Sequence, residues 1–264
     1  PLLPRRRRQA SSSRLMKILL INANTTAAVT ERIAAEARRI AAPGTEILPV
    51  TGTFGAPIIG TRAEMAIAEH TALDLFARHG KGVDAVVIGV SFDVGLRALR
   101  EVADVPVVGM TEAACLLACT QGGPFGIVTY GARSAGILRE IVAGYGLAGR
   151  LAGVHGLDAT PADMLADPQA LHAQIAGAAC DLALRDGAEA VILAGAVMAG
   201  LPPLIQVQVP CPLVEGIASG IGLAELLVRL APAKARSGSF AAIGERASSG
   251  LSPELTALLG RTIS

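Results

Sequence analysis

The chain has 264 residues, of which 52% are hydrophobic and 17% are charged. This composition excludes disorder over most of the chain and is sufficient for one large core or for two lobes of roughly 100 residues each. The net charge of +1 is misleading: residues 1–15 hold five of the 23 basic residues and no acid, which leaves 18 basic against 22 acidic residues in the remainder. A mildly acidic body excludes a nucleic-acid partner held by net charge.

Residues 1–15 (PLLPRRRRQASSSRL) contain no apolar stretch of secretory length, so no signal peptide is predicted. We interpret them as a disordered extension, with the folded chain beginning near Met16. Residues 190–214 lack any charge but include four prolines, which excludes a single membrane-spanning helix over this run. We therefore expect a cytoplasmic protein with no membrane partner.

Short apolar strands alternate with segments of helical period from Lys17 onward, and this order predicts parallel sheets with right-handed crossovers. In the first half we expect strands at Lys17–Ile21, Thr45–Val50, the apolar run after Asp84, and Val105–Gly109, with helices at Ala27–Ala41, Ala63–Arg78 and Leu96–Val102. In the second half we expect strands at Phe125–Tyr130, Leu151–Val154, the apolar run after Glu189, and near Pro212, with helices at Gly131–Gly144, Gln169–Asp186, Ile217–Leu230 and Ser252–Gly260.

Two segments of the chain repeat each other without a gap, 105 positions apart. The first is DAVVIGVSFDVGL, from Asp84 to Leu96, and the second is EAVILAGAVMAGL, from Glu189 to Leu201. An acid, a β-branched run and then small residues are typical of a buried parallel strand that leads into a loop. The repeat predicts two pseudo-symmetric α/β lobes, and the loops after the two strands are expected to face one ligand cleft.

The first predicted lobe consists of two separate segments of the chain, and the second of one. We expect lobe 1 to comprise residues 16–120 with 215–230, lobe 2 to comprise residues 121–214, a linker over 231–250, and a C-terminal helical segment over 251–264. The apolar helices and this last segment are compatible with a homo-oligomer. The four cysteines show no CxxC spacing and no His-rich neighbourhood, so we expect no metal site.

Several motifs resemble the aspartate/glutamate/hydantoin racemase superfamily, and most closely its hydantoin and allantoin racemase branch. They are KILLINANTT, FGAPIIG, Phe-Asp-Val-Gly-Leu, Gly-Ile-Val-Thr and Met198-Ala-Gly-Leu, spread over about residues 16–230. The resemblance implies cofactor-independent transfer of an α-proton of a small amino-acid-derived carboxylate or hydantoin. In that family two cysteines, one from each lobe, face opposite sides of the stereocentre.

The chain departs from the family at these cysteines. The motifs put the first family cysteine at Val90 and the second at Gly195, and neither residue can carry a proton. Three hypotheses stay open: an isomerase that uses non-standard acid/base groups such as Ser91, Asp93 or a bound water; a related lyase of the decarboxylase type; and a non-catalytic protein that binds small acids or ureides. For Asp93 an alternative role is to cap the helix that begins near Gly95.

The resemblance also implies which residues contact the ligand. They are Asn22, Asn24, Thr25, Ser91, Phe92, Thr129, Tyr130, and the backbone of Gly195 and Ala196. Asn24 or Thr25 could also serve as the N-cap of the first helix, and Tyr130 could be a half-buried ring of the core.

Overall fold

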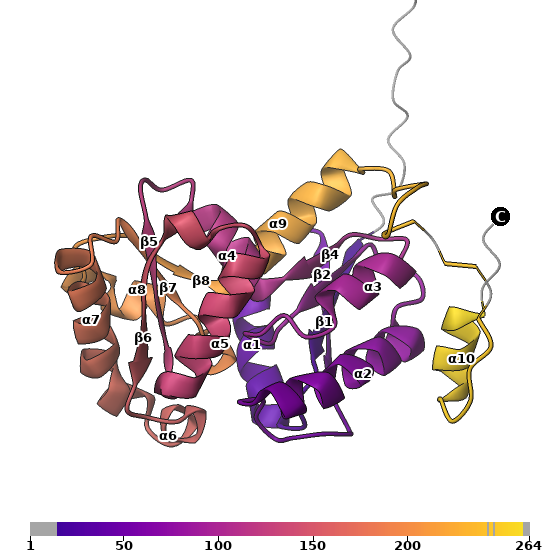
Figure 1. The fold of residues 1–264 in the computed structure, drawn as a ribbon, viewed down its shortest axis with the longest axis horizontal. Coiled ribbons are helices and arrows are strands. Elements are labelled where there is room, and N and C mark those ends of the chain that lie inside the picture. The colour runs from indigo at the N-terminus through magenta and orange to yellow at the C-terminus, as the bar shows by residue number, and fades with distance from the viewer. Residues whose placement is uncertain (1–14, 242, 245, 261–264) are drawn as a thin grey trace, which may run out of the picture.

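The protein is a two-sheet α/β structure, described here from a computed structural model that covers residues 15–241, 243–244 and 246–260 (Figure 1). The first sheet has the order β2-β1-β3-β4, and its strands are Met16–Asn22 (β1), Thr45–Thr51 (β2), Ala85–Ile88 (β3) and Val107–Gly109 (β4). The second sheet has the order β6-β5-β7-β8, and its strands are Phe125–Tyr130 (β5), Leu151–Leu157 (β6), Ala190–Leu193 (β7) and Leu213–Glu215 (β8). All neighbouring strands are parallel, so the predicted fold class is confirmed.

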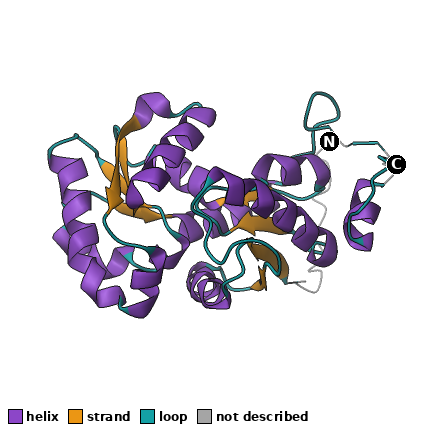
Figure 2. Cartoon of the chain, turned by 60° about the horizontal axis from the view of Figure 1, so that its bottom comes forward, coloured by secondary structure: helices purple, strands orange, loops and turns teal. Residues whose placement is uncertain are grey.

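Helices enclose both sheets, as the turned view of Figure 2 shows. Those of the first half are Ala27–Ile40 (α1), Arg62–His79 (α2), Leu96–Val102 (α3) and Met110–Ala118 (α4). Those of the second half are Gly131–Gly144 (α5), Pro161–Ala166 (α6), Pro168–Leu184 (α7), Pro202–Ile205 (α8), Gly216–Leu230 (α9) and Pro253–Leu259 (α10), with 3-10 turns at Ala148–Arg150 (η1), Ala196–Met198 (η2) and Gln206–Gln208 (η3).

The central strands are apolar because both of their faces are covered. Every residue of β3 and of β7 is buried, as expected for strands in the middle of a helix-covered parallel sheet. The acid that precedes each of these two strands accepts a hydrogen bond from a backbone amide at or just before the start of the neighbouring strand. Asp84 accepts from the Lys17 amide at 2.8 Å, and Glu189 accepts from the Gly123 amide. The repeat is therefore visible in the structure as two equivalent strands in equivalent sheets.

Helix α9 belongs spatially to the first sheet although it follows the last strand of the second (Figure 1). It packs against α1, α4 and β3. The boundaries that we place near residues 120 and 215 stay predictions. The expected disordered extension falls almost wholly on residues 1–14, and the end of the C-terminal segment on 261–264, which lie outside the described residues.

The C-terminal helix α10 docks on the same chain, against α2. Leu255 and Leu258 are buried there, and the Ser252 hydroxyl, at the N-cap, accepts a hydrogen bond from the Leu255 amide. Helix α6, a short helix that begins with a Thr160–Asp163 capping box, was not predicted. Among the helices that the structure describes, none is long and apolar enough to span a membrane.

Candidate functional site

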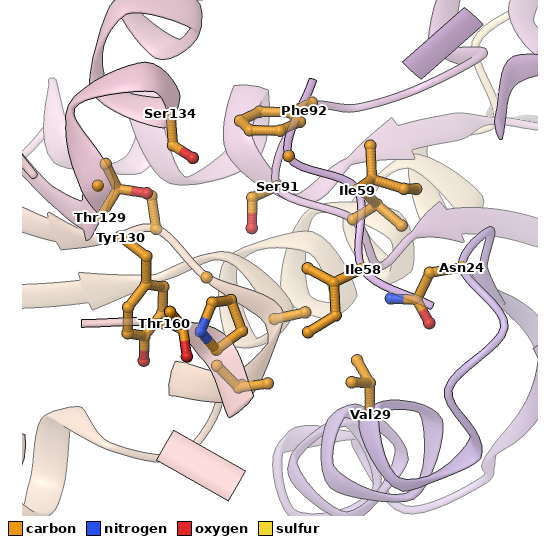
Figure 3. A pocket seen from close by; sticks show the side chains of 18 of the residues that line it. Asn24, Val29, Ile58, Ile59, Ser91, Phe92, Thr129, Tyr130, Ser134 and Thr160 are labelled. Atoms are coloured by element: carbon orange, nitrogen blue, oxygen red, sulfur yellow. The ribbon is translucent and has the colours of Figure 1, made fainter. Parts of the chain in front are cut away.

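A cavity of about 240 Å³ lies between the two sheets, beyond the carboxyl ends of β1, β3, β5 and β7 (Figure 3). This is where parallel sheets place their ligands, because the strand-to-helix loops of both sheets converge there. Seven of the nine predicted ligand-contacting residues line it: Asn24, Ser91, Phe92, Thr129, Tyr130, Gly195 and Ala196. The structure therefore brings together, from both lobes, most of the residues that the resemblance implied.

Asn22 and Thr25 do not line the cavity. Asn22 is fully buried, and its Nδ2 donates to Asn24 Oδ1 and to Thr30 Oγ1, both at 2.9 Å, so it holds the shape of the loop after β1. The prediction that Asn24 or Thr25 caps α1 is wrong. The N-cap is Thr26, whose side chain makes no capping hydrogen bond and instead donates from Oγ1 to the Pro57 carbonyl at 2.6 Å. The Thr26 amide donates to Asn24 Oδ1 at 2.9 Å.

Val90 and Gly195, the positions of the two family cysteines, face the cavity from the ends of β3 and β7. Val90 presents an apolar wall. A Cβ atom added at Gly195 would lie 2.9 Å from Tyr130 Cε2, although the backbone φ of 175° is one that any residue adopts. The ring of Tyr130 therefore occupies the space that a side chain at position 195 would need.

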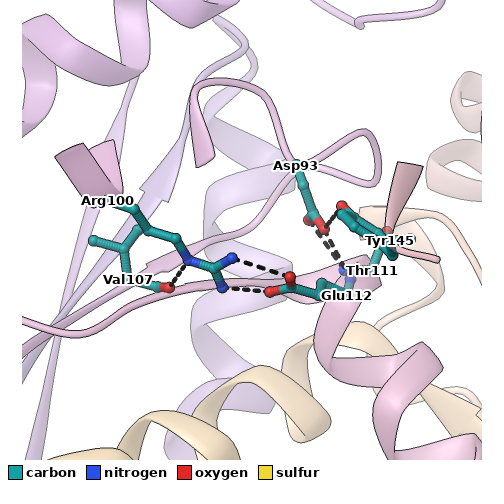
Figure 4. Close-up of polar contacts among 6 residues, drawn as sticks. All are labelled: Asp93, Arg100, Val107, Thr111, Glu112 and Tyr145. Carbon is teal, nitrogen blue, oxygen red and sulfur yellow. Dashed lines mark hydrogen bonds and ion pairs between the residues drawn. The ribbon is translucent and has the colours of Figure 1, made fainter. Parts of the chain in front are cut away.

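Asp93 does not line the cavity. It anchors the loop that carries Val90, and Figure 4 shows its carboxylate directed at Thr111 and Tyr145. Its carboxylate accepts hydrogen bonds from the amides of Thr111 and Glu112, at 3.0 and 2.8 Å, and from Tyr145 Oη at 2.6 Å. The expectation that it caps the helix beginning near Gly95 is wrong, because it caps α4 instead. The helix near Gly95 has no side-chain cap.

The charged groups around Asp93 form a network of hydrogen bonds and an ion pair that holds the loop in place. Burial raises the pKa of Asp93 to about 6, opposed by the hydrogen bond from Tyr145 and by those from the two amides. Glu112, beside it on α4, pairs with the Arg100 guanidinium, and Arg100 Nε also donates to the Val107 carbonyl at 3.0 Å. The same loop is held from a second side, since Thr111 Oγ1 donates to the Ser91 carbonyl at 2.6 Å.

No cysteine, carboxylate, histidine or lysine lines the cavity among the residues that the structure describes. Cys115 is buried in α4, where burial raises the pKa of its thiol. The polar groups of the cavity are hydroxyls and one amide, supplied by Asn24, Ser91, Thr129, Tyr130, Ser134 and Thr160. Such a surface binds and orients a small polar molecule, but it offers no pair of bases on opposite faces.

Ser134, Thr160 and the Ile58–Ile59 pair were absent from the sequence-based set. The isoleucines lie in the FGAPIIG motif, which carried the resemblance without a role for its individual residues. Thr160 is the N-cap of α6, which was not predicted, and Ser134 lies one turn into α5. The Thr-x-x-Asp capping pattern was the available signal for Thr160.

Fold and cavity together define a two-lobed α/β protein with its ligand cleft at the carboxyl ends of two parallel sheets. The family model for Asp/Glu/Hydantoin racemase matches residues 18–224. A hydantoin racemase from Pseudomonas sp. (strain NS671) is 31% identical over 216 residues, which cover 81% of this chain and 87% of that protein.

Two solved structures are similar over nearly their whole length. The allantoin racemase from Pseudomonas fluorescens has a TM-score of 0.86 and 32% identity, covering 89% of this chain and 100% of that one. The allantoin racemase from Klebsiella pneumoniae has a TM-score of 0.86 and 34% identity, covering 91% and 98%. The chain belongs to the Asp/Glu/hydantoin racemase family, as the sequence motifs predicted.

Proposed function

We propose that this racemase-family protein binds a small amino-acid-derived carboxylate, ureide or hydantoin in the interlobe cleft, without a thiol pair and without a cofactor. One observation carries the proposal: a cavity with a hydroxyl-rich lining lies between the two sheets, while Val90 and Gly195 stand where the resemblance puts the two cysteines. Binding needs only shape and hydrogen-bond partners, whereas racemisation needs an acid or base on each side of the stereocentre.

A second candidate is one-sided proton transfer, either in an isomerase with non-standard groups or in a lyase that protonates one face. The observation that favours it is the Tyr130 ring against Gly195, which puts a phenol beside the position of the second cysteine. Burial raises the pKa of Tyr130, so at neutral pH the group is a proton donor and a poor base. Ser91, from the opposite loop, is a still weaker acid.

The two candidates differ in whether the α-proton exchanges. The test combines calorimetric binding with α-proton exchange in deuterated water, followed by NMR, across amino acids, N-carbamoyl amino acids, 5-substituted hydantoins and allantoin. We expect binding of at least one compound and exchange of none. If α-proton exchange persists in the purified protein and is lost in Tyr130→Phe, then the protein is an enzyme with one-sided proton transfer and not a binding protein.

A variant that fills the cavity tests its location. Ser134→Phe on α5 adds a ring to the lining, and Ala132→Phe adds the same ring to an exposed position of the same helix. We expect Ser134→Phe to abolish binding and Ala132→Phe to leave it unchanged. Equal affinities in the two variants would place the ligand somewhere else.

A further inference from the structure

The two lobes supply different kinds of side chain to the cavity. Most of the large apolar side chains that line it come from lobe 1, and they are those of Val29, Ile58, Ile59, Val90 and Phe92. Lobe 2 supplies the hydroxyl-bearing side chains of Thr129, Ser134 and Thr160 and the ring of Tyr130. Figure 3 shows Ile58 and Val29 across the cavity from Thr129 and Thr160. The cavity therefore has an apolar wall on lobe 1 and a polar wall on lobe 2.

Ile58 differs from the other residues of the apolar wall. Val29 is buried in the apolar cluster that contains Tyr130, and Ile59 and Phe92 are buried in the large cluster of lobe 1. Ile58 is only half-buried, and it packs against none of the three apolar clusters that the described residues form. Part of its apolar surface therefore faces the cavity, where a ligand can cover it.

Hydrogen bonds fix the backbone on both sides of Ile58. Before it, the Pro57 carbonyl accepts from Thr26 Oγ1 at 2.6 Å. After it, the Gly60 amide donates to Glu64 Oε2 at 2.8 Å. The side chain is thus held at the cavity before a ligand arrives, and a group that is already in place loses little conformational freedom on binding.

Two polar side chains, Asn24 and Ser91, interrupt the apolar wall. Asn24 Oδ1 already accepts from Asn22 Nδ2 and from the Thr26 amide, both at 2.9 Å. These bonds orient the amide so that its Nδ2 is left for the ligand, and an amide nitrogen can only donate. A carbonyl oxygen fits beside Asn24, whereas a substituent that carries its own N–H groups does not.

We propose that Ile58 selects the side chain of the ligand, so that the cleft prefers a molecule with its polar end on lobe 2 and an aliphatic side chain on lobe 1. An apolar group gains free energy where it covers apolar surface. A polar substituent in the same place loses hydrogen bonds to water that this wall does not replace. The inference rests on the proposed function and names the kind of side chain that its ligand carries.

Two probes of similar size test this preference. 5-Isobutylhydantoin and allantoin share one ring, and their substituents have the same number of non-hydrogen atoms, one aliphatic and one a polar ureido group. We expect calorimetry to give binding of 5-isobutylhydantoin that is tighter by about tenfold. From 5-methylhydantoin to 5-propylhydantoin the affinity should rise about fourfold for each added methylene.

Variants of Ile58 assign the preference to this residue. Ile58→Ala should weaken the binding of 5-isobutylhydantoin about tenfold and that of allantoin less than about twofold, because only the first loses apolar contact. Ile58→Asn should bring the two affinities together, since it replaces apolar surface by an amide. Leu184→Ala, at a position of α7 that is 75% exposed, is the control and should change neither affinity.

Thermal melting without ligand separates a role in binding from a role in the core. Ile58→Ala should leave Tm unchanged, because the side chain packs against none of the apolar clusters. Ile59→Ala, at the next position, should lower Tm, because Ile59 is buried in the large cluster.

Each result has one meaning. Allantoin that binds as tightly as 5-isobutylhydantoin, or equal losses for the two probes in Ile58→Ala, overturns the selection by Ile58 while the binding function stands. A fall in Tm for Ile58→Ala as large as that for Ile59→Ala assigns Ile58 to the core and also overturns it. If neither probe binds, and no other compound of the exchange panel binds, the proposed function fails and the inference fails with it.

Discussion

The two lobes cap equivalent helices with carboxylates that come from different parts of the chain. Helices α4 and α9 each follow the last strand of a sheet, and each leaves backbone amides without partners at its start. In lobe 2 the N-cap residue Glu215 accepts from the amides of Ile217 and Ala218, at 2.8 and 2.5 Å. In lobe 1 the N-cap is Gly109, and the carboxylate comes from Asp93 in the preceding loop.

The use of Asp93 as the cap depends on the glycine at position 109. A Cβ atom at Gly109 would lie 2.4 Å from Asp93 Cγ, so only a glycine at this position leaves space for the Asp93 carboxylate. At the position of the repeat that corresponds to Asp93, lobe 2 has Met198, which is buried. Its amide donates to the Gly195 carbonyl at 2.8 Å, and its carbonyl accepts from the Leu201 amide at 3.0 Å. The loop of Val90 is therefore held by hydrogen bonds to helix α4 and to Tyr145 of the other lobe, whereas the loop of Gly195 is held by hydrogen bonds within its own turn.

The largest expected effect follows from removing this tie. Asp93→Ala leaves the amides of Thr111 and Glu112 and the hydroxyl of Tyr145 without their acceptor, and it opens a cavity beside Gly109. We expect a loss of roughly 3 kcal/mol in the free energy of unfolding, measured by urea denaturation. Ligand affinity should fall as well, because the Ser91–Phe92 segment loses its anchor.

The matched variant is Glu215→Ala, which removes the corresponding cap in lobe 2. Its loss is expected to be about 2 kcal/mol, with ligand affinity retained, because Glu215 holds no part of the cavity loop. Equal losses of affinity in the two variants would contradict the distinction between a tied and an untied loop.

The sequence was sufficient for the strands and for most helices, because buried parallel strands such as Ala85–Ile88 and Ala190–Leu193 are apolar throughout and because the repeat fixes their equivalence. It was also sufficient for the side of the sheets on which the cavity lies. It was not sufficient for Asp93, whose partners on α4 lie 18 and 19 residues away and depend on a glycine elsewhere. The contact between the Tyr130 ring and position 195 was equally out of reach, since it depends on side-chain packing at the ends of β5 and β7.

A pH effect should follow from the two capping carboxylates. Burial raises the pKa of Asp93 to about 6 and that of Glu215 to about 7, whereas the unfolded chain releases these protons near pH 4. Between these values the folded protein holds protons that the unfolded chain has lost, so stability falls as pH rises from about 4 to 7. We expect a loss on the order of 1 kcal/mol from each group between pH 5 and pH 7.5, seen as a lower Tm at the higher pH.

Asp93→Asn serves to assign this effect. It removes one titrating group, so the difference in Tm between pH 5 and pH 7.5 should shrink relative to the wild type. Asp163→Asn is the control, because that carboxylate lies at the surface and hydrogen bonds to Thr160 lower its pKa. A pH dependence that is the same in Asp93→Asn and the wild type would mean that Asp93 is ionised throughout.

The two positions of the missing cysteines should tolerate a thiol unequally. Gly195→Cys brings its Cβ against the Tyr130 ring, and overpacking is expected to cost roughly 1.5 kcal/mol. Val90→Cys exchanges one small buried side chain for another and should cost less than about 1 kcal/mol. Gly195→Ala carries the same Cβ and should share most of the cost, and Tyr130→Ala should relieve it in a double-mutant cycle. If the double variant Val90→Cys, Gly195→Cys exchanges no α-proton even with Tyr130 shortened, then the assignment of these positions to the family cysteines is wrong or the ligand is not its substrate.

The last comparison concerns the hydroxyls of the two tyrosines, of which one has a hydrogen-bond partner and the other has none in the described residues. Tyr145 Oη donates to Asp93 at 2.6 Å across the lobes, whereas Tyr130 Oη has no partner in the described residues. Tyr145→Phe is therefore expected to lower the free energy of unfolding by about 1 kcal/mol, because Asp93 keeps its two amide donors but loses the third. Tyr130→Phe should leave this free energy unchanged or raise it slightly.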